Sequence, residues 1–371
     1  MIINFIKNEI VFIIACILAI ISSFIITPSA EYLSYIDFRT LALLLALMLV
    51  VQGLKCCGVF DTLINILMKK INTKRQLALM LVSLCFFSSM LITNDVALIT
   101  FVPFTMMLLT MLKDSSFSIY LIVLETIAAN LGSMFTPIGN PQNLYLYSIS
   151  NMSISNFLRC MFPYTAISFL LLFIAVMIIK PQPLREDVDD IACKKTESLK
   201  TKPLLIYIVL FIICILTVLH ILNYIVMLAI VLLTVLLLNY KLLAKADYIL
   251  LLTFVAFFIF IGNMKNIPAV NDFLNSLVTG RECQISILAS QVVSNVPAAM
   301  LLSGFTTDYK NLLIGVNLGG LGTLIASMAS LISFKFYCKE PNKNAKKYIL
   351  MFTLLNILFL AILFVSYLLL N

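Results

Sequence analysis

Long apolar runs separated by short polar or basic stretches dominate the hydrophobicity pattern of this chain. Runs of about 20 apolar residues are long enough to cross a bilayer as helices. Cut at charges and helix breakers, the pattern predicts apolar blocks at about 10–27, 40–57, 76–112, 117–133, 156–179, 203–220, 223–239, 248–264, 283–305, 311–334 and 348–370. We therefore expect an all-α polytopic membrane protein.

Composition agrees with this expectation and narrows the alternatives. Of 371 residues, 62% are apolar and 11% are charged, and the mean hydropathy is +1.09, values far from those of soluble domains. The net charge of +8 does not indicate nucleic acid, because the basic residues cluster at the ends of apolar blocks. The nine cysteines include no CxxC pair and lie mostly within apolar blocks, which favours structural thiols.

The basic clusters predict the orientation in the membrane. They lie at 69–75, 180–202, 241–245 and 335–347, and the positive-inside rule places all four in the cytoplasm. The N-terminus is then cytoplasmic and the C-terminus outside, with 181–202 as a cytoplasmic linker. This count holds only if two segments enter and leave the membrane on the same side.

The segment 282–305 is the clearest such case. Its two arms contain 12 and 10 residues, so each reaches about 15 to 18 Å as a helix, too short for a bilayer core of about 30 Å. Polar and helix-breaking residues lie at the turn between the arms, namely Ser290, Gln291, Ser294, Asn295 and Pro297. The pattern predicts a re-entrant hairpin.

The first half of the chain contains a counterpart at 76–112. The stretches SSMLITNDVA and ASQVVSNVPA align with an offset of 201 residues, and NLGSMFTPIGN aligns with NLGGLGTLIAS further on. Two matches in one order indicate an internal repeat, and the charge count makes its halves, 1–180 and 203–371, inverted. Ser88 and Ser89 shorten the apolar part of the first arm to 77–87. A surface loop between two full spans is the alternative for this first hairpin.

Two further features recur in both halves. Amphipathic stretches at 59–71 and 268–278 precede the hairpins and suit helices at the membrane interface. Broken helices follow the hairpins, at 117–143 with TPIGNPQN and at 311–334 with NLGGLGT. Breakers at membrane depth free backbone groups, which must then face protein, water or a ligand. For Gly319 and Gly320, close helix packing is the alternative explanation.

These motifs together resemble the ion transporter superfamily, in particular citrate-transporter-like bacterial anion permeases. The resemblance is strongest at TNDVALITFVPFT, ANLGSMFTPIGNPQN, SNVPA and GVNLGGLGTLIAS. The superfamily includes sodium-coupled carboxylate carriers, arsenite permeases and sodium/proton antiporters. The resemblance implies an elevator, in which 76–180 and 282–371 move against the other spans, and it leaves a homodimer open.

The predicted hairpins and broken helices lack basic residues, since no Lys or Arg occurs in 88–103, 125–143, 289–304 or 311–333. A bound anion must then rely on helix N-terminal amides, on Asn and Ser/Thr groups and on a co-bound cation. The candidate substrate-binding residues are Thr93, Asn94, Thr136, Gly139, Asn140, Ser294, Asn295 and Thr323. The candidate coupling-ion residues are Asp95, Asn94, Asn130, Asn295 and Asn317.

Two acidic residues lie inside apolar blocks. Asp95 departs from the dicarboxylate carriers, whose hairpin tips resemble Ser-Asn-Thr, and a carboxylate repels an anion unless a proton or metal cation neutralises it. We interpret Asp95 as a coupling-ion or proton group, with a helix N-cap as the alternative. Glu125 is a secondary candidate, as a proton relay or as the partner of a group on a neighbouring helix.

The predicted function is secondary active transport of a small anion, a di- or tricarboxylate or an inorganic oxyanion, coupled to Na⁺ or H⁺. We expect no enzyme activity, since no Walker loop and no pairing of a nucleophile with a base is evident, and no cofactor beyond Na⁺. The expected partners are the anionic substrate and the lipid bilayer of the cell membrane. Arsenite or antimonite efflux and sodium/proton antiport are the main alternatives; a channel or a membrane enzyme is a more distant one.

Overall fold

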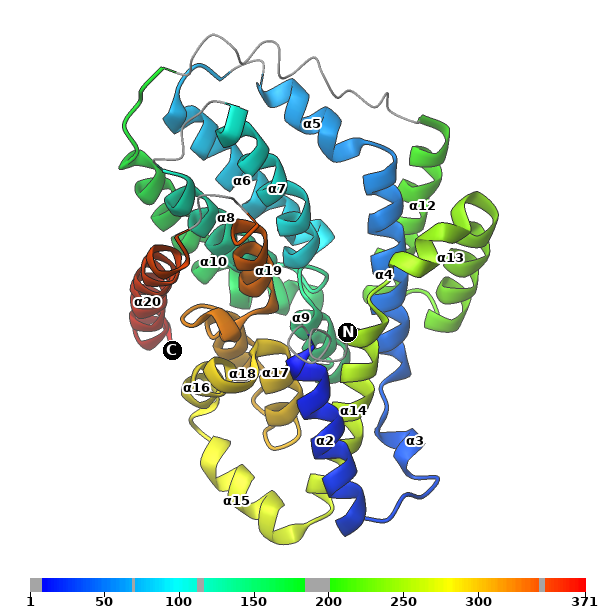
Figure 1. The fold of residues 1–371 in the computed structure, drawn as a ribbon. Helices are drawn as coiled ribbons and strands as arrows, with labels where there is room; N and C mark the ends of the chain where they lie inside the picture. The colour runs from blue at the N-terminus through cyan, green and yellow to red at the C-terminus, as the bar shows by residue number, and fades with distance from the viewer. Residues whose placement is uncertain (1–8, 69–70, 112–116, 184–200, 340–343) are drawn as a thin grey trace.

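The computed structural model describes residues 9–68, 71–111, 117–183, 201–339 and 344–371 (Figure 1). These residues form helices and connecting turns, without a strand, and one isolated bridge pairs Thr73 with Pro183. Most of the expected cytoplasmic linker at 181–202 lies outside the described residues. The chain is thus all-helical over the part that the structure describes.

The first half of the chain contains nine described helices. They are α2 (Ile10–Ile25), α3 (Tyr32–Tyr35), α4 (Phe38–Cys56), α5 (Val59–Met68), α6 (Lys74–Ile92), α7 (Asn94–Met111), α8 (Ser118–Ser133), α9 (Pro141–Ser150) and α10 (Ile154–Met177).

The second half of the chain begins at α12 and includes two short 3₁₀ helices, η1 and η2. The elements are α12 (Thr201–Val218), α13 (Tyr224–Asn239), η1 (Tyr240–Lys245), α14 (Tyr248–Lys265), α15 (Pro268–Val278), α16 (Glu282–Val293), α17 (Asn295–Ser303), α18 (Tyr309–Leu318), η2 (Leu324–Ala326), α19 (Met328–Tyr337) and α20 (Ala345–Leu370).

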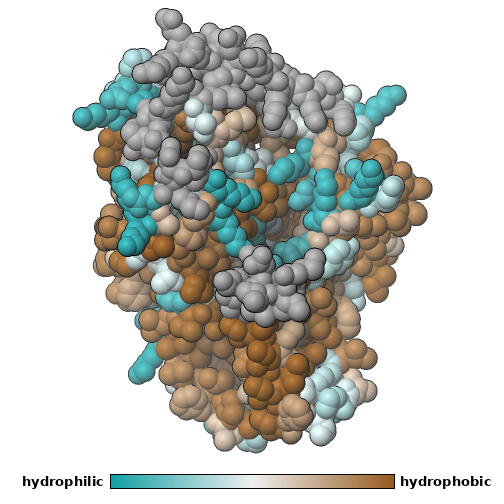
Figure 2. Space-filling view, in the orientation of Figure 1, coloured by the Kyte–Doolittle hydropathy of each residue, from teal (hydrophilic) through white to brown (hydrophobic). Residues whose placement is uncertain are grey.

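Many of these helices suit a membrane. Seven helical segments of the described residues are long and apolar enough to span one: α4, α6, α10, α12, α13 with η1, α14 and α20. Their outer surfaces are apolar, and Figure 2 shows hydrophobic residues over the lower part of the molecule and over α13. Since apolar side chains on the outside of a helical protein are stable in lipid, the chain is a multi-pass membrane protein.

The helices form two groups that lie side by side (Figure 1). In one group, α2 packs against α14, and α4 packs against α12 and α13. In the other group, α6 packs against α8 and α16 packs against α18, while α7 contacts α19 and α9 contacts α17. The amphipathic helices α5 and α15 connect the groups at opposite ends of the molecule. We call the first group the α4–α14 block and the second the paired-helix block.

Two helix breaks in the paired-helix block have the same backbone conformation. Thr93, between α6 and α7, has φ 73° and ψ 151°. Ser294, between α16 and α17, has φ 74° and ψ 155°. A positive φ is uncommon for residues other than glycine. The two positions are those aligned with an offset of 201 residues, so the chain makes the same turn twice.

The arms that lead into these breaks differ in length. Helix α16 has 12 residues, the length expected from the sequence, whereas α6 has 19 and is about 28 Å long. The apolar pattern limited this arm to 77–87. The helix continues because Ser88 and Ser89 donate their hydroxyl hydrogen bonds to carbonyls of α6 itself. Polar serines therefore did not mark the end of this helix.

Irregular backbone follows α8 and α18 in the paired-helix block. It covers 134–140 before α9, and 319–327, including η2, before α19. A Cβ atom added at Gly139 would lie 2.0 Å from the Ser133 carbonyl oxygen, so only glycine fits there. A Cβ atom at Gly319 would lie 2.6 Å from Ser290 Oγ, so this glycine allows α18 to approach α16 closely.

Candidate functional site

The break at Thr93 is held against the irregular segment after α8. The backbone amide of Asn94 donates to the Gly139 carbonyl at 3.1 Å, and the Thr136 hydroxyl donates to the Met90 carbonyl. Backbone groups that leave a helix need such partners, because an unpaired one is costly away from water. Three predicted site residues, Asn94, Thr136 and Gly139, thus lie together.

The second half of the chain makes a corresponding contact through a different side chain. Gln291 Nε2 donates to the carbonyls of Gly319 and Leu321 at 3.0 and 2.9 Å. Its Oε1 accepts from the amide of Thr323 at 2.9 Å. Gln291 was recognised as a turn residue in the sequence but not as a site residue. Thr323, a predicted substrate-binding residue, is exposed.

Asn130 on α8 connects the start of α7 to α19. Asn94 Nδ2 donates to Asn130 Oδ1 at 3.1 Å, and Asn130 Nδ2 lies 3.3 Å from Ser330 Oγ. Ser327 Oγ donates to Asn130 Oδ1 at 3.0 Å. All four side chains are buried. An Asn side chain has two donors and one acceptor oxygen, and Asn130 uses both kinds to join the two halves of the chain.

A second set of asparagines joins the start of α9 to α18. Asn140 Nδ2 donates to Asn317 Oδ1 at 3.1 Å, and Asn317 Nδ2 donates to Asn143 Oδ1 at 2.7 Å. Asn140 Oδ1 caps α9 by accepting from the Asn143 amide at 2.9 Å. We call the five residues Asn94, Asn130, Asn140, Asn143 and Asn317 the asparagine network.

The predicted residues at the second break stay outside this network. Asn295 is buried, and its oxygen lies 3.5 Å from the Ser294 hydroxyl. A Cβ atom at Gly320 would lie 2.9 Å from Asn295 Nδ2, so the glycine leaves room for this amide. No hydrogen bond between the described side chains joins Asn295 to Asn317 or Asn130. The structure therefore brings Asn94, Asn130, Asn140 and Asn317 together, and it leaves Asn295 beside them.

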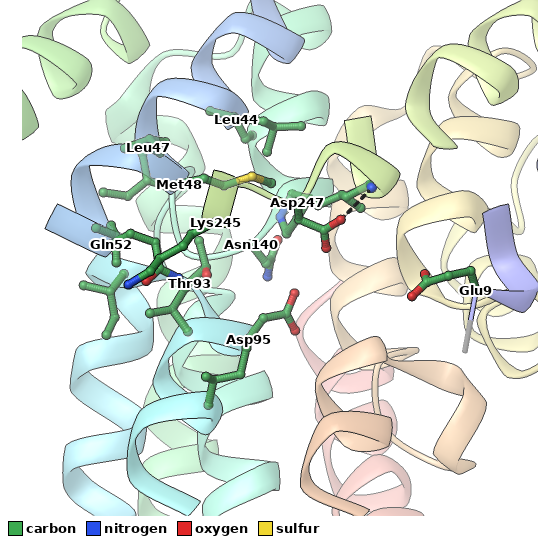
Figure 3. A pocket seen from close by; sticks show the side chains of 18 residues that line it. Glu9, Leu44, Leu47, Met48, Gln52, Thr93, Asp95, Asn140, Lys245 and Asp247 are labelled. Atoms are coloured by element: carbon green, nitrogen blue, oxygen red, sulfur yellow. Dashed lines mark hydrogen bonds between the residues drawn. The ribbon is translucent and has the colours of Figure 1, made fainter. Parts of the chain in front are cut away.

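A cavity of about 410 Å³ lies between the two helix blocks. We call it the acidic cavity. The paired-helix block contributes the starts of α7 and α9, and the α4–α14 block contributes α4 and the end of η1 (Figure 3). Its polar and charged lining residues are Glu9, Gln52, Thr93, Asp95, Asn140, Lys245 and Asp247.

The negative charge of Asp95 has few hydrogen-bonding partners in its surroundings. Its Oδ1 is buried and accepts no hydrogen bond from the described residues. The side chain points into the acidic cavity towards Asp247 (Figure 3). No described backbone amide donates to it, so the N-cap alternative has no support here. A buried carboxylate oxygen without a partner favours uptake of a proton or a cation.

Two other charged residues of the acidic cavity, Asp247 and Lys245, each have a polar contact of their own. Asp247 caps α14 by accepting from the Leu250 amide at 2.9 Å. Lys245 Nζ lies 3.8 Å from Cys56 Sγ. Among the described residues, no cluster of three or more His, Cys, Asp or Glu residues could hold a metal ion. A cation in this cavity would therefore rely on fewer than three of these carboxylates together with neutral oxygens.

Glu125 lies apart from the acidic cavity. It is fully buried on α8, and Thr105 on α7 donates a hydrogen bond to its Oε1. Its Oε2 has no partner among the described residues. The contact with Thr105 is the pairing with a neighbouring helix that the sequence left open. The alternative role as a proton relay stays a prediction.

Several residues of this site were missed by sequence reasoning. Ser133 Oγ accepts a hydrogen bond from Asn140 Nδ2 at 3.2 Å. Asn143 and Ser133 lie inside the motifs NPQN and NLGS, so their pattern was visible although their role was not. Asp247 was missed because the charged segment around it reads as a loop between spans. Only packing shows that it lies opposite Asp95.

These features define a multi-pass helical membrane protein in which a buried asparagine network adjoins an acidic cavity. The family model described as "Citrate transporter" matches residues 1–309, and the chain belongs to this family. The predicted resemblance to citrate-transporter-like permeases is thus confirmed.

Relatives of the chain are transporters or membrane proteins. It is 33% identical to an uncharacterized transporter of Methanocaldococcus jannaschii, over 84% of each chain. It is 31% identical to the inner membrane protein YbiR of Escherichia coli, over 81% of this chain and 80% of the relative. A silicon efflux transporter of Oryza sativa is 34% identical over 38% of this chain and 28% of its own length. The chain is therefore a transporter by family.

Proposed function

We propose that this protein is a secondary active transporter of a small anion, a di- or tricarboxylate or an inorganic oxyanion, coupled to Na⁺ or H⁺. The observation that carries the proposal is the unpaired carboxylate oxygen of Asp95 at the start of α7, beside a cavity and the asparagine network. An acid placed there would bind the coupling cation. The cation would then compensate the charge of the anion.

The polar groups near Asp95 suit an oxygen-rich solute. The starts of α7 and α17 supply helix N-terminal amides, which favour anions. Lys245 is the only Lys or Arg among the described residues that line the acidic cavity. An anion would therefore enter together with a cation or proton, because Asp95 and Asp247 repel it otherwise.

The pairing of helices supports alternating access by an inverted repeat. Thr93 and Ser294 share one backbone conformation, α6–α8 corresponds to α16–α18, and α7–α19 corresponds to α9–α17. We propose that the paired-helix block moves as an elevator against the α4–α14 block. In this proposal, α5 and α15 serve as hinge arms, and the N-terminus lies in the cytoplasm and the C-terminus outside.

A neutral oxyacid such as arsenous or antimonous acid is the second candidate substrate. The carboxylates of the acidic cavity do not repel a neutral solute, and Asp95 could then exchange a proton. The name of the rice relative, a silicon efflux transporter, favours this candidate. Sodium/proton antiport is the third, because it also requires an acidic residue that faces a cavity.

Thermal unfolding of the purified protein in detergent tests these candidates. Carboxylates, sulfate, phosphate and arsenite are each added in Na⁺ buffer and in choline buffer. A ligand at about 100 times its Kd stabilises the folded state by about 2.7 kcal/mol. Stabilisation by one anion class only with Na⁺, or only at low pH, supports the anion proposal. Stabilisation by arsenite alone, or by Na⁺ alone, replaces it with the second or third candidate.

A further inference from the structure

A second cavity lies at the other end of the same helices. It has a volume of about 300 Å³, and we call it the lysine cavity. On α14, Leu250 lines the acidic cavity, whereas Phe258 and Lys265 line the lysine cavity. On α9, Leu144 lines the acidic cavity and Ile149 lines the lysine cavity. Both cavities thus lie between the two helix blocks, one beyond the other.

Three aromatic rings separate the cavities, and two of them, Tyr145 and Phe258, also line the lysine cavity. The ring centroid of Tyr145 on α9 lies 6.4 Å from that of Phe254 and 5.7 Å from that of Phe258, both on α14. The two phenylalanine rings are 6.1 Å apart. From Leu250 to Phe258 the helix rises about 12 Å. The cavities are therefore separated by a short plug of apolar rings, with Phe254 fully buried.

The plug is also fixed from a third helix. The Tyr145 hydroxyl lies 2.8 Å from Ser303 Oγ at the end of α17. A buried phenol needs such a partner. The ring of Tyr145 is thus held by the paired-helix block, whereas Phe254 and Phe258 belong to the α4–α14 block. A movement of one block against the other would separate the rings.

The lysine cavity offers a positive charge to a ligand, whereas the acidic cavity offers a negative one. Its acid, Asp37, is engaged, because it caps α4 and accepts hydrogen bonds from the amide and the hydroxyl of Thr40. Its cation, Lys265, has no hydrogen bond or ion pair with a described residue. The lysine stem packs near Gly304, where an added Cβ would lie 2.9 Å from Lys265 Cε. The ammonium group is left for a ligand.

We propose that the lysine cavity is the opposite entrance of the transport path, that Lys265 attracts a small anion there, and that Tyr145, Phe254 and Phe258 form the barrier between the two entrances. This inference rests on the proposed function only in calling the path a transport path. The barrier and the charge preference do not depend on a bound substrate. They can be measured without knowledge of the substrate.

The barrier is tested with the double variant Phe254→Ala/Phe258→Ala of the full chain in planar lipid bilayers under a KCl gradient. Removal of two rings should open a leak, because a hydrophobic constriction excludes ions only while it stays narrow and dry. The matched control is Phe162→Ala/Phe173→Ala, which removes two rings exposed on the outer surface. A leak in the first variant and none in the control supports the barrier. Equal conductance in both overturns it.

The role of Lys265 is tested in the same leaking background. We expect chloride to permeate better than potassium, and Lys265→Gln should lower this preference several-fold while Lys265→Arg retains it. The control is Lys310→Gln, because Lys310 is exposed and bonds to Asn371. An unchanged chloride preference with Lys265→Gln overturns the charge role.

Folding is checked by gel filtration and thermal unfolding in detergent. If the double alanine variant does not fold, the single variants Phe254→Ala and Phe258→Ala replace it, since each leaves a smaller cavity. Leak above the control in either supports the barrier, and wild-type tightness in both overturns it. A protein that passes the leak tests but transports none of the proposed solutes refutes the proposed function alone. A protein that transports one of them but fails the leak tests refutes this inference alone.

Discussion

Asn140 and Asn317, which lie 177 positions apart in the chain, form a direct hydrogen bond of 3.1 Å between Nδ2 and Oδ1 inside the membrane protein. Asn317 Nδ2 in turn donates a hydrogen bond to Asn143 Oδ1 at 2.7 Å. The start of α9 and the end of α18 are thereby joined without any charged group. Loss of one member of such a buried amide network lowers the stability of the protein, because the remaining buried partners cannot form hydrogen bonds with water instead.

Asn317→Ala should destabilise the protein by about 1–3 kcal/mol, since it leaves the buried Asn143 Oδ1 without a partner and leaves the Asn140 amide with Ser133 Oγ alone. Thermal unfolding in detergent measures the change. The control is Asn275→Ala on α15, where the amide bonds only to Asn271. Equal midpoints for the two variants would show that the network does not hold the two halves together.

Asn94→Ala and Asn295→Ala should each abolish transport while the protein still folds. Asn94 begins α7 and contacts Asn130, and Asn295 begins α17, so both are close to where the helix N-termini would meet a substrate. Uptake into proteoliposomes is the measurement, with gel filtration as the test of folding. Near-normal uptake by both variants would remove these residues from the site.

Asp95→Asn should uncouple transport from its driving ion. The substitution keeps the size of the side chain but removes the negative charge that would bind Na⁺ or H⁺. Uptake should become insensitive to the Na⁺ or pH gradient, whereas Asp272→Asn, at an exposed position on α15, should behave as wild type. Full ion dependence in Asp95→Asn would exclude Asp95 as the coupling group.

Gly132→Ala should destabilise the contact between α6 and α8. The added Cβ atom would lie 2.1 Å from the Phe86 carbonyl oxygen, and relief of such overlap typically costs about 1–3 kcal/mol. Gly304→Ala is the matched control, because its nearest atoms, Ile261 Cγ2 and Lys265 Cε at 2.9 Å, belong to side chains and not to backbone. Similar unfolding midpoints for both variants would contradict the rigid contact.

Much of this architecture could be read from the sequence because membrane helices leave a strong signal. Each apolar block must satisfy its own backbone hydrogen bonds in lipid, so block length and helix breakers mark the elements. The break at Ser294 fell where polar residues and Pro297 predicted it. The predicted length of the helical arm before Thr93 was wrong. Ser88 and Ser89 donate their hydroxyl hydrogen bonds to carbonyls of α6, so the helix continues past them.

The class of protein, the positions of the paired helix breaks and four of the five asparagines of the network could be predicted from the sequence alone. Apolar periodicity and motif repetition are local along the chain, and these features depend on them. Helix packing alone places Asp95 and Asp247 on the same cavity, Glu125 beside Thr105, and Tyr145 against Phe254. These residues lie 20 to more than 150 positions apart in the chain, and their proximity follows from packing between helices, which no local pattern records.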